Sequence, residues 1–305
     1  MSALTILSDE EQSYFDAIKD FAKKEITPHV AAMDEAQQVN KDIVKKLFDM
    51  GLMGIEVPQS LEGSEASFFT AILAVQAVSQ VDPSVGVMVD VQNTLVNNAF
   101  MRWGSDALKK KYLPQLATGK VGSYCLSESS SGSDAFALKT KAAKKGDKYI
   151  LNGQKLWITN AGEADIFIII ANLNPEVGYK GITAFVVERG FKGFSVSKKE
   201  NKLGIRASST CELVLEDCEV PLENLLGEEG KGYKVAIETL NEGRIGIGAQ
   251  MVGLAEAALN HAVEYVKTRN QFGKPIASFQ GMQFQLAQMA IDVETAKLMV
   301  YNAAR

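Results

Sequence analysis

Residues 148–159 read KYILNGQKLWIT, two runs of strand-forming residues on either side of Asn152-Gly153. Asn-Gly supplies the positive φ angles of a type I′ turn, so this stretch predicts a β-hairpin. Further β-branched or alternating runs follow at 166–171, 182–187 and 212–215. No helical pattern of useful length separates these runs. The region from about 121 to 226 is therefore predicted to be an antiparallel β domain and not a doubly wound α/β fold.

Helical periodicity flanks the β region on both sides. Ser8 to Glu11 forms a capping-box pattern, and residues 68–80 are apolar nearly all round, which predicts a buried helix. The long helical pattern of 233–269 is rich in small residues, and a last helix is predicted from about Gln280. We predict three domains: N-terminal helical, 1–119; middle β, 120–228; C-terminal helical, 229–305.

Composition excludes several classes of protein. The 305 residues include 32 Lys and Arg against 37 Asp and Glu, a net charge of −5 that disfavours nucleic acid binding. Three cysteines without a CxxC pair indicate a reducing compartment, and two distant histidines predict no metal site. The apolar runs fall short of the roughly 20 residues that span a membrane. Neither a signal peptide nor a transit peptide is visible at the N-terminus.

Three stretches concentrate polar and aromatic residues, although the common catalytic signatures GxGxxG, GxxxxGK, GxSxG and HExxH are missing from the sequence. They are YCLSESSSGSD at 124–134, WITNAG at 157–162 and LNEGR at 240–244. Each also has a purely structural interpretation. The first would be a hydrophilic loop after a strand, the second a tryptophan in a core, and the third an exposed helix face.

Taken together, five segments resemble the acyl-CoA dehydrogenase family, in its order and spacing along essentially the whole chain. The segments are YCLSE…GSD, LNGQKLWITNAG, NKLGIRASSTCELVLEDCEVP, LNEGRIGIGAQMVGLA and RNQFGKPIASFQG. VGYKGITAF, LNEGR and YNAAR look most like the short/branched-chain members, with the straight short-chain members as the nearest competitors. The resemblance implies an N-terminal helical domain, a barrel-like middle β domain and a C-terminal helical bundle that is incomplete here.

The resemblance also implies a reaction and its participants. FAD would accept hydride from the β-carbon of a short or branched acyl-CoA, such as 2-methylbutanoyl-CoA, while a carboxylate removes the α-proton. An electron-transfer flavoprotein would reoxidise the flavin. Family members are homotetramers built from dimers. Eukaryotic members work in the mitochondrial matrix, so we expect that compartment, or the cytoplasm if the source is bacterial.

The same resemblance assigns residues to two sites. Leu126 and Ser127 would lie along the isoalloxazine edge, Trp157 would cover the ring, and Thr159 would bind near N5. The implied cofactor-binding set is Tyr124, Leu126, Ser127, Ser133, Trp157, Ile158, Thr159 and, across a dimer interface, Arg269 and Gln280. The implied substrate-binding set is Ser133, Tyr179, Tyr233, Asn241, Glu242, Gly243 and Arg244.

Two departures from the family pattern matter. Ser130 stands where the family usually has glycine, so its backbone would be strained if the site needs positive φ. The catalytic glutamate of short- and branched-chain members lies downstream of Arg305, and the alternative position on the long helix is Gly243. Glu242 lies about 100° of helix rotation away from that position. We therefore expect a C-terminally truncated chain that has no catalytic residue and little or no dehydrogenase activity.

Other functions remain open at this point. A non-catalytic product could bind acyl-CoA or a full-length subunit through the apolar stripe of the last helix. The shortened chain could also simply misfold. A straight short-chain (butanoyl-CoA) dehydrogenase and an acyl-CoA oxidase share the implied fold.

Overall fold

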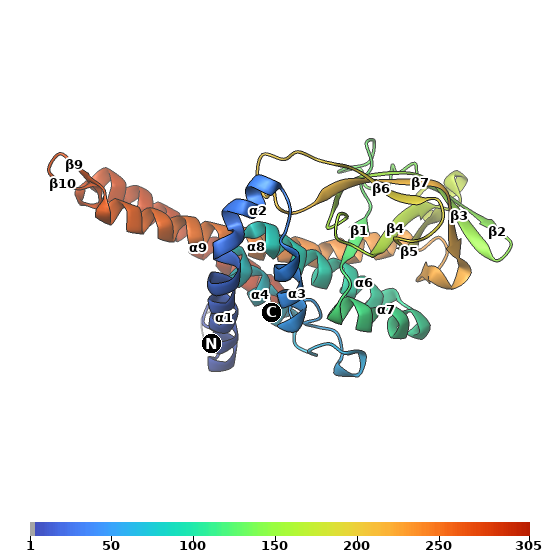
Figure 1. Cartoon of the computed structure of the whole chain (residues 1–305), viewed down its shortest axis with the longest axis horizontal. Helices are drawn as coiled ribbons and strands as arrows, with labels where there is room; N and C mark the ends of the chain where they lie inside the picture. Colours follow the sequence, from blue (N-terminus) through green and yellow to red (C-terminus); the bar gives the residue numbers. More distant parts are fainter. Residues whose placement is uncertain (1–3) are drawn as a thin grey trace.

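The computed structural model describes residues 4–305 and shows a helical N-terminal part, a β-sheet beside it, and a long helical hairpin that projects away (Figure 1). The predicted capping box of Ser8 and Glu11 is present at the start of the first helix. The N-terminal elements are α1 (Asp9–Phe21), η1 (Ala22–Ile26), η2 (Thr27–His29), α2 (Val30–Ala36), α3 (Lys41–Asp49), η3 (Gln59–Leu61), α4 (Phe68–Ser79), α5 (Pro83–Asp90), η4 (Val91–Asn97), α6 (Asn98–Trp103) and α7 (Asp106–Thr118).

Helix α4 is the centre of the helical part, as its apolar pattern predicts. All of its residues except Phe68 and Thr70 are buried. Asp82 caps α5 by accepting a hydrogen bond from the Ser84 amide at 2.7 Å, and Pro83 occupies the first helical turn. This pairing of an N-cap acid with proline explains why the chain breaks between α4 and α5.

The middle of the chain forms one mixed β-sheet with two short helices, η5 and η6, between its strands. Its elements are β1 (Gly122–Cys125), β2 (Lys141–Lys145), β3 (Lys148–Thr159), β4 (Ile166–Asn172), η5 (Pro175–Gly181), β5 (Ile182–Glu188), β6 (Phe194–Lys199), β7 (Thr210–Pro221), η6 (Leu222–Asn224) and β8 (Leu225–Leu226). The strand order is β6-β7-β3-β2-β4-β5-β8, and β1 pairs with β4 off this path. The sheet is an open path without barrel closure. It is mainly antiparallel, but β1 and β2 both run parallel to β4.

The predicted hairpin at Asn152-Gly153 is wrong, because both residues lie inside the continuous strand β3. Strand β3 pairs with β2 on one edge and with β7 on the other, so no turn can form there. The register between the two strands shifts here because Asn152 of β3 faces two residues of β7, Glu216 and Asp217, so the bulge lies in β7. The turn between β2 and β3 instead contains Gly146, whose φ is 63°.

The C-terminal part is a hairpin of two long helices, α8 (Gly232–Thr268) and α9 (Gln280–Ala304). Its tip contains β9 (Asn270–Gln271), β10 (Lys274–Pro275) and η7 (Ile276–Ser278), and Figure 1 shows the tip far from the sheet. Glycines let α8 approach the N-terminal helices closely. A Cβ at Gly253 would lie 2.3 Å from the Gln76 carbonyl oxygen.

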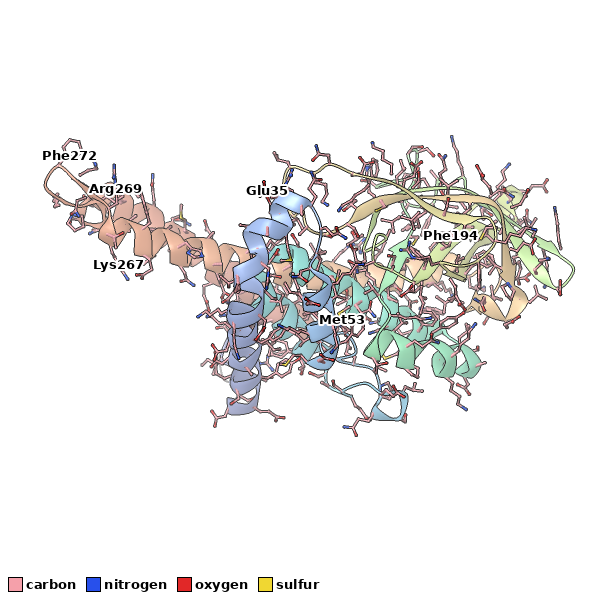
Figure 2. The ribbon with its side chains drawn as sticks, viewed as in Figure 1. Glu35, Met53, Phe194, Lys267, Arg269 and Phe272 are labelled. Carbon is pink, nitrogen blue, oxygen red and sulfur yellow. The ribbon has the colours of Figure 1, made fainter. Side chains whose placement is uncertain are left out.

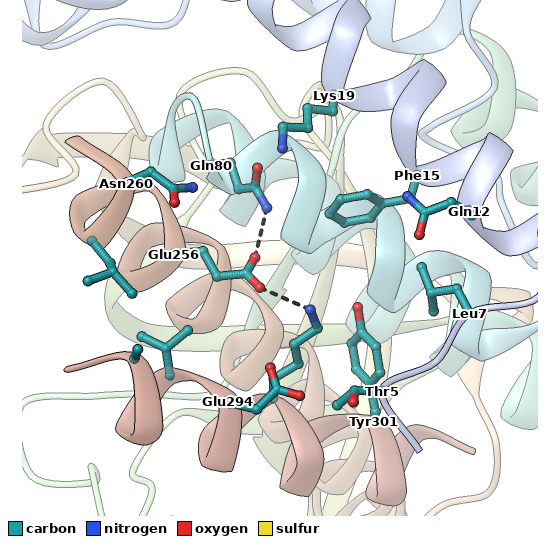
Figure 3. Close-up of a pocket in the computed structure, with 14 residues that line it drawn as sticks. Thr5, Leu7, Gln12, Phe15, Lys19, Gln80, Glu256, Asn260, Glu294 and Tyr301 are labelled. Carbon is teal, nitrogen blue, oxygen red and sulfur yellow. Dashed lines mark hydrogen bonds and ion pairs between the residues drawn. The ribbon is translucent and has the colours of Figure 1, made fainter. Parts of the chain in front are cut away.

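A polar network joins the hairpin to the N-terminal helices (Figure 3). The Glu256 carboxylate accepts hydrogen bonds from the Gln76 and Gln80 amides, both at 2.7 Å, and lies 3.2 Å from the Lys297 ammonium. The Tyr301 hydroxyl donates to the Gln76 side chain at 2.8 Å. Gln80, Glu256, Lys297 and Tyr301 border a cavity of about 420 Å³ beside α1, α8 and α9. Among the helices of residues 4–305, none is long and apolar enough to cross a membrane.

Candidate flavin and acyl-CoA site

The segment Leu126–Ser127 leaves the end of β1 and runs beside β3. The Leu156 amide donates to the Ser127 carbonyl at 2.9 Å, and the Lys155 ammonium donates to the Leu126 carbonyl at 3.0 Å. Within β1, the Ser123 hydroxyl donates to the carbonyl of Thr159, the last residue of β3, at 2.9 Å. These bonds place Leu126 and Ser127 alongside the 156–159 end of β3, so the structure brings two of the predicted stretches together.

Several hydrogen-bonding groups at this junction have no protein partner. Within residues 4–305, no hydrogen bond uses the backbone amides of Leu126 and Ser127 or the hydroxyls of Ser127 and Thr159. The Tyr124 hydroxyl is buried and unpaired as well, and burial raises its pKa above the ordinary range. Buried or half-buried polar groups normally find partners. A cluster of unpaired donors at one junction therefore fits a ligand that carries hydrogen-bond acceptors.

Trp157 is the most unusual residue of β3. Its φ is 58°, and the residue is 54% exposed. It lies where the register with β7 shifts between Lys155 and Ile158, while Ile158 itself is buried. A bulky residue rarely adopts left-handed backbone, and such strain concentrates at functional sites. An exposed indole beside unpaired donors fits a planar ring with an acceptor edge, which is the shape and chemistry of isoalloxazine.

Tyr179 and Tyr233, two predicted substrate-binding residues, come together from η5 and α8. Their ring centroids are 5.0 Å apart with the rings nearly perpendicular. Phe136, from the loop that follows Ser133, completes the cluster at 6.3 Å from Tyr179 and 6.4 Å from Tyr233. The sequence analysis missed Phe136, since one aromatic residue in a polar loop gives no periodic signal.

The loop from Glu128 to Ala137 is held by its own backbone and by Ser131. The Ser131 hydroxyl donates to the carbonyls of Asp134 and Ala135, both at 3.0 Å, and leaves Ser133 exposed to solvent. Ser130 is not among the described residues with positive φ. The backbone of Ser130 therefore does not carry the strain that a positive φ would cause in a residue other than glycine.

The other predicted residues of α8 are Asn241 to Arg244. Arg244 is exposed and donates to the Asn241 side chain at 2.5 Å. Glu242 forms an ion pair with Arg102 of α6, and burial raises the pKa of its carboxyl, opposed by the Arg102 charge. Gly243 faces the side chain of Leu95, since a Cβ there would lie 2.5 Å from Leu95 Cδ2. Leu95, Leu240 and Tyr233 pack on the same apolar cluster as Leu126, which connects α8 to the β1 end.

Arg269 and Gln280 lie in a different part of the structure, away from the β1–β3 junction (Figure 1). Both are exposed at the tip of the α8–α9 hairpin, and Figure 2 shows Arg269 close to Phe272 at the far end of the molecule. The structure does not bring them near Leu126 or Trp157 within one chain. A role at a flavin would require a second chain, as the resemblance implies.

Three family models match the chain in succession. They describe the N-terminal domain of acyl-CoA dehydrogenases at residues 8–120, the middle domain at 123–218 and the C-terminal domain at 230–305. Together they cover nearly the whole chain, and they follow the helix–sheet–helix order of the structure.

Individual proteins and solved structures of this family are similar to the chain as well. The chain is 54% identical to a probable short/branched chain specific acyl-CoA dehydrogenase from Dictyostelium discoideum, over 99% of this chain and 73% of that protein. It superposes on the structure of butyryl-CoA dehydrogenase from Megasphaera elsdenii with a TM-score of 0.96 and 41% identity, covering 100% of this chain and 80% of the other. A chain from a structure of the electron transferring flavoprotein of Acidaminococcus fermentans gives a TM-score of 0.97 at 43% identity, with coverage of 100% and 80%. Relatives from mitochondria and from bacteria both match.

Solved relatives include chains with FAD or its reduced form bound. The unpaired donors and the exposed indole at the β1–β3 junction fit that cofactor. This chain therefore belongs to the acyl-CoA dehydrogenase family, a family of FAD-dependent oxidoreductases.

Proposed function

We propose that this protein supplies the flavin and acyl-CoA site of an enzyme that dehydrogenates short and branched acyl-CoA thioesters between their α- and β-carbons and passes the electrons to an electron-transfer flavoprotein. The observation that carries the proposal is the β1–β3 junction, where unpaired donors surround a strained, exposed Trp157. Similarity to short/branched-chain relatives supports the choice of substrate. Similarity to a chain from an electron transferring flavoprotein structure supports the choice of partner.

When bound, FAD supplies the acceptor for the hydride of the substrate. The amides of Leu126 and Ser127 and the hydroxyls of Ser127 and Thr159 would bind the acceptor edge of the ring, with Tyr124 and Ile158 behind them. Donors aimed at a ring that gains electrons favour its reduced form. Trp157 would cover one face of the ring and exclude water from it.

The aromatic cluster of Phe136, Tyr179 and Tyr233 would form a wall of the acyl-CoA channel, with Ser133 and Asn241 to Arg244 along it. Gly243 has no side chain, and Glu242 is held by Arg102. We therefore propose that α8 does not supply the base that removes the α-proton. Arg269 and Gln280 would reach the FAD of a second chain. A guanidinium is a suitable ligand for the diphosphate because it donates two hydrogen bonds at once.

The test is a titration of the purified protein with FAD, followed by acyl-CoA thioesters. We expect the protein to take up FAD, and we expect 2-methylbutanoyl-CoA to perturb the flavin absorption at lower concentration than butanoyl-CoA or palmitoyl-CoA. Free CoA is the control for binding without an acyl group. Failure to bind FAD would refute the function. Tighter binding of butanoyl-CoA would favour the straight short-chain alternative.

A further inference from the structure

The interior of the β domain contains an ion pair that the proposed function does not yet use. Lys155 of β3 and Glu128, just after Ser127, lie with Nζ and Oε1 2.7 Å apart. The Lys155 side chain is 0% exposed and that of Glu128 is 6% exposed. Every other ion pair among the described residues includes side chains that are considerably more exposed. This pair is therefore a built feature of the core and not a surface contact.

Glu128 is bound on both of its carboxylate oxygens. Oε1 accepts from the Thr140 amide at 3.1 Å in addition to Lys155, and Oε2 accepts from the Lys139 amide at 2.6 Å. Burial raises the pKa of this carboxyl, but the Lys155 charge and these hydrogen bonds outweigh burial, so the pKa lies below its usual value. Glu128 thereby anchors the Lys155 ammonium in one position.

The second hydrogen bond of Lys155 points toward the predicted flavin edge. Its ammonium donates to the Leu126 carbonyl at 3.0 Å. The Leu126 carbonyl and the Ser127 amide belong to one planar trans peptide, so their C=O and N–H bonds point in opposite directions. Fixing the carbonyl toward Lys155 therefore directs the Ser127 N–H away from the core. The Leu156 amide fixes the next peptide through the Ser127 carbonyl at 2.9 Å.

A buried ion pair is a poor way to stabilise a fold, since desolvation of the two charges offsets most of their attraction. A cation on a peptide carbonyl does have a specific local effect, because hydrogen bonds in a chain polarise one another. The Ser127 N–H becomes a stronger donor when the carbonyl of its own peptide accepts from an ammonium. The Ser127 N–H has no acceptor among residues 4–305, so this strengthened donor is available to a ligand.

We propose that Lys155 is a positioning residue for the flavin: anchored by Glu128, it orients and polarises the Leu126–Ser127 peptide so that the Ser127 N–H donates to the electron-rich reduced ring. This inference rests on the proposed function, which places FAD against Leu126 and Ser127. Lys155 would therefore contribute to the tighter binding of reduced FAD relative to oxidised FAD, in addition to the affinity for FAD as such.

The deciding variant is Lys155→Met/Glu128→Gln. It removes both charges together, so no uncompensated ion is left in the core, and glutamine keeps an acceptor near the Lys139 and Thr140 amides. The matched control is Lys148→Met/Glu219→Gln, on the same strand, whose ion pair of 2.6 Å is exposed to solvent. Lys155→Met alone is a poorer probe because it leaves a buried carboxylate unpaired, which destabilises strongly.

Two quantities are measured on the full chain: the dissociation constant of FAD and the two-electron midpoint potential of the bound flavin. We expect the core variant to bind oxidised FAD several-fold more weakly and to lose about tenfold of its preference for reduced flavin. That loss corresponds to a midpoint potential about 30 mV more negative. The control should leave both quantities unchanged. Lys155→Gln/Glu128→Gln, which retains a neutral donor, should fall between the parent and the core variant, and it takes the place of the core variant if that one does not fold.

The outcomes separate the two claims. A parent chain that does not bind FAD overturns the proposed function and this inference with it. A parent that binds FAD, with a folded core variant whose midpoint potential is unchanged, overturns the role of Lys155 alone. An equal shift in the control variant would also overturn it, because the effect would then be a general response to charge.

Discussion

Gly246 of α8 lies directly against the carboxyl group of Asp90 of α5: a Cβ at Gly246 would be 1.8 Å from Asp90 Oδ1. The same Oδ1 accepts from the Thr94 hydroxyl at 2.9 Å, and Asp90 is fully buried. The missing side chain thus allows a polar group of the N-terminal helices to lie against the C-terminal hairpin. The close approach of α5 and α8 depends on this contact.

Gly246→Ala is expected to destabilise the protein. The added methyl group overlaps the Asp90 carboxyl and approaches Thr94, and such overpacking costs about 1–3 kcal/mol. The higher helix propensity of alanine offsets at most about 1 kcal/mol. Urea denaturation of the apoprotein measures the change. Gly281→Ala on α9 is the control, since a Cβ there meets nothing within 4 Å, and it should be neutral or slightly stabilising.

The stability of the protein should fall as pH rises toward neutrality because of Asp90. Burial raises the pKa of Asp90 to about 7 in the folded protein, against about 3.9 in an unfolded chain. Between these values the folded state binds more protons than the unfolded state. The free energy of unfolding therefore decreases as pH rises, by at most about 1.4 kcal/mol per pH unit, and levels off above pH 7.

Asp90→Asn removes this titration and keeps an oxygen that accepts from Thr94. Urea denaturation at a series of pH values should show a flatter profile between about pH 4 and pH 7, with a gain in stability at pH 7 relative to the parent. Asp16→Asn, at an exposed position of α1, is the control and should leave the profile unchanged. Glu56, whose pKa burial also raises to about 7, should account for part of the slope that remains. A steeper profile in Asp90→Asn would contradict the prediction.

Trp157→Gly should separate stability from cofactor binding. Glycine adopts a φ of 58° without steric cost, so the strain of about 1–2 kcal/mol is relieved, although glycine loses about 0.5–1 kcal/mol of chain entropy. We expect the apoprotein to keep its stability to within about 1 kcal/mol. We expect FAD to bind at least tenfold more weakly because the indole no longer covers the ring.

Thermal denaturation and FAD titration measure these two effects. Glu62→Gly is the matched control, since Glu62 is exposed and has a φ of 68° at the end of η3. It should relieve comparable backbone strain without any effect on FAD. A Trp157→Gly variant with parental FAD affinity would remove Trp157 from the proposed site.

Phe136→Ala should weaken acyl-CoA binding while FAD affinity stays the same. Its ring stacks on Tyr179 and meets Tyr233 edge to face, and such aromatic pairs contribute about 0.5–1.5 kcal/mol beyond their buried area. We expect a several-fold increase in the dissociation constant of 2-methylbutanoyl-CoA, measured by perturbation of the flavin absorption. Phe191→Ala, in the loop between β5 and β6, is the control. Equal losses in both variants would place Phe136 outside the acyl-CoA channel.

The sequence by itself determined the elements whose signals are local. Ser8 caps α1 as the pattern predicts, because a cap needs only its neighbours within one turn. The buried helix α4 follows from its apolar composition. The family motifs likewise identified Leu126, Ser127, Trp157 and Thr159 as candidates, since each lies within a short, distinctive run of residues.

Only the tertiary structure decided the features that depend on partners distant in sequence. Asn152-Gly153 lies inside a continuous strand and does not form a turn, because β7 pairs along the strand that carries it. Lys155 points into the core toward Leu126 and Glu128, which are 29 and 27 residues away along the chain. Phe136 gains its meaning from Tyr179 and Tyr233 in the same way. Propensity and periodicity describe a residue in its own segment, whereas these roles arise from strand register and packing between segments, which no local pattern specifies.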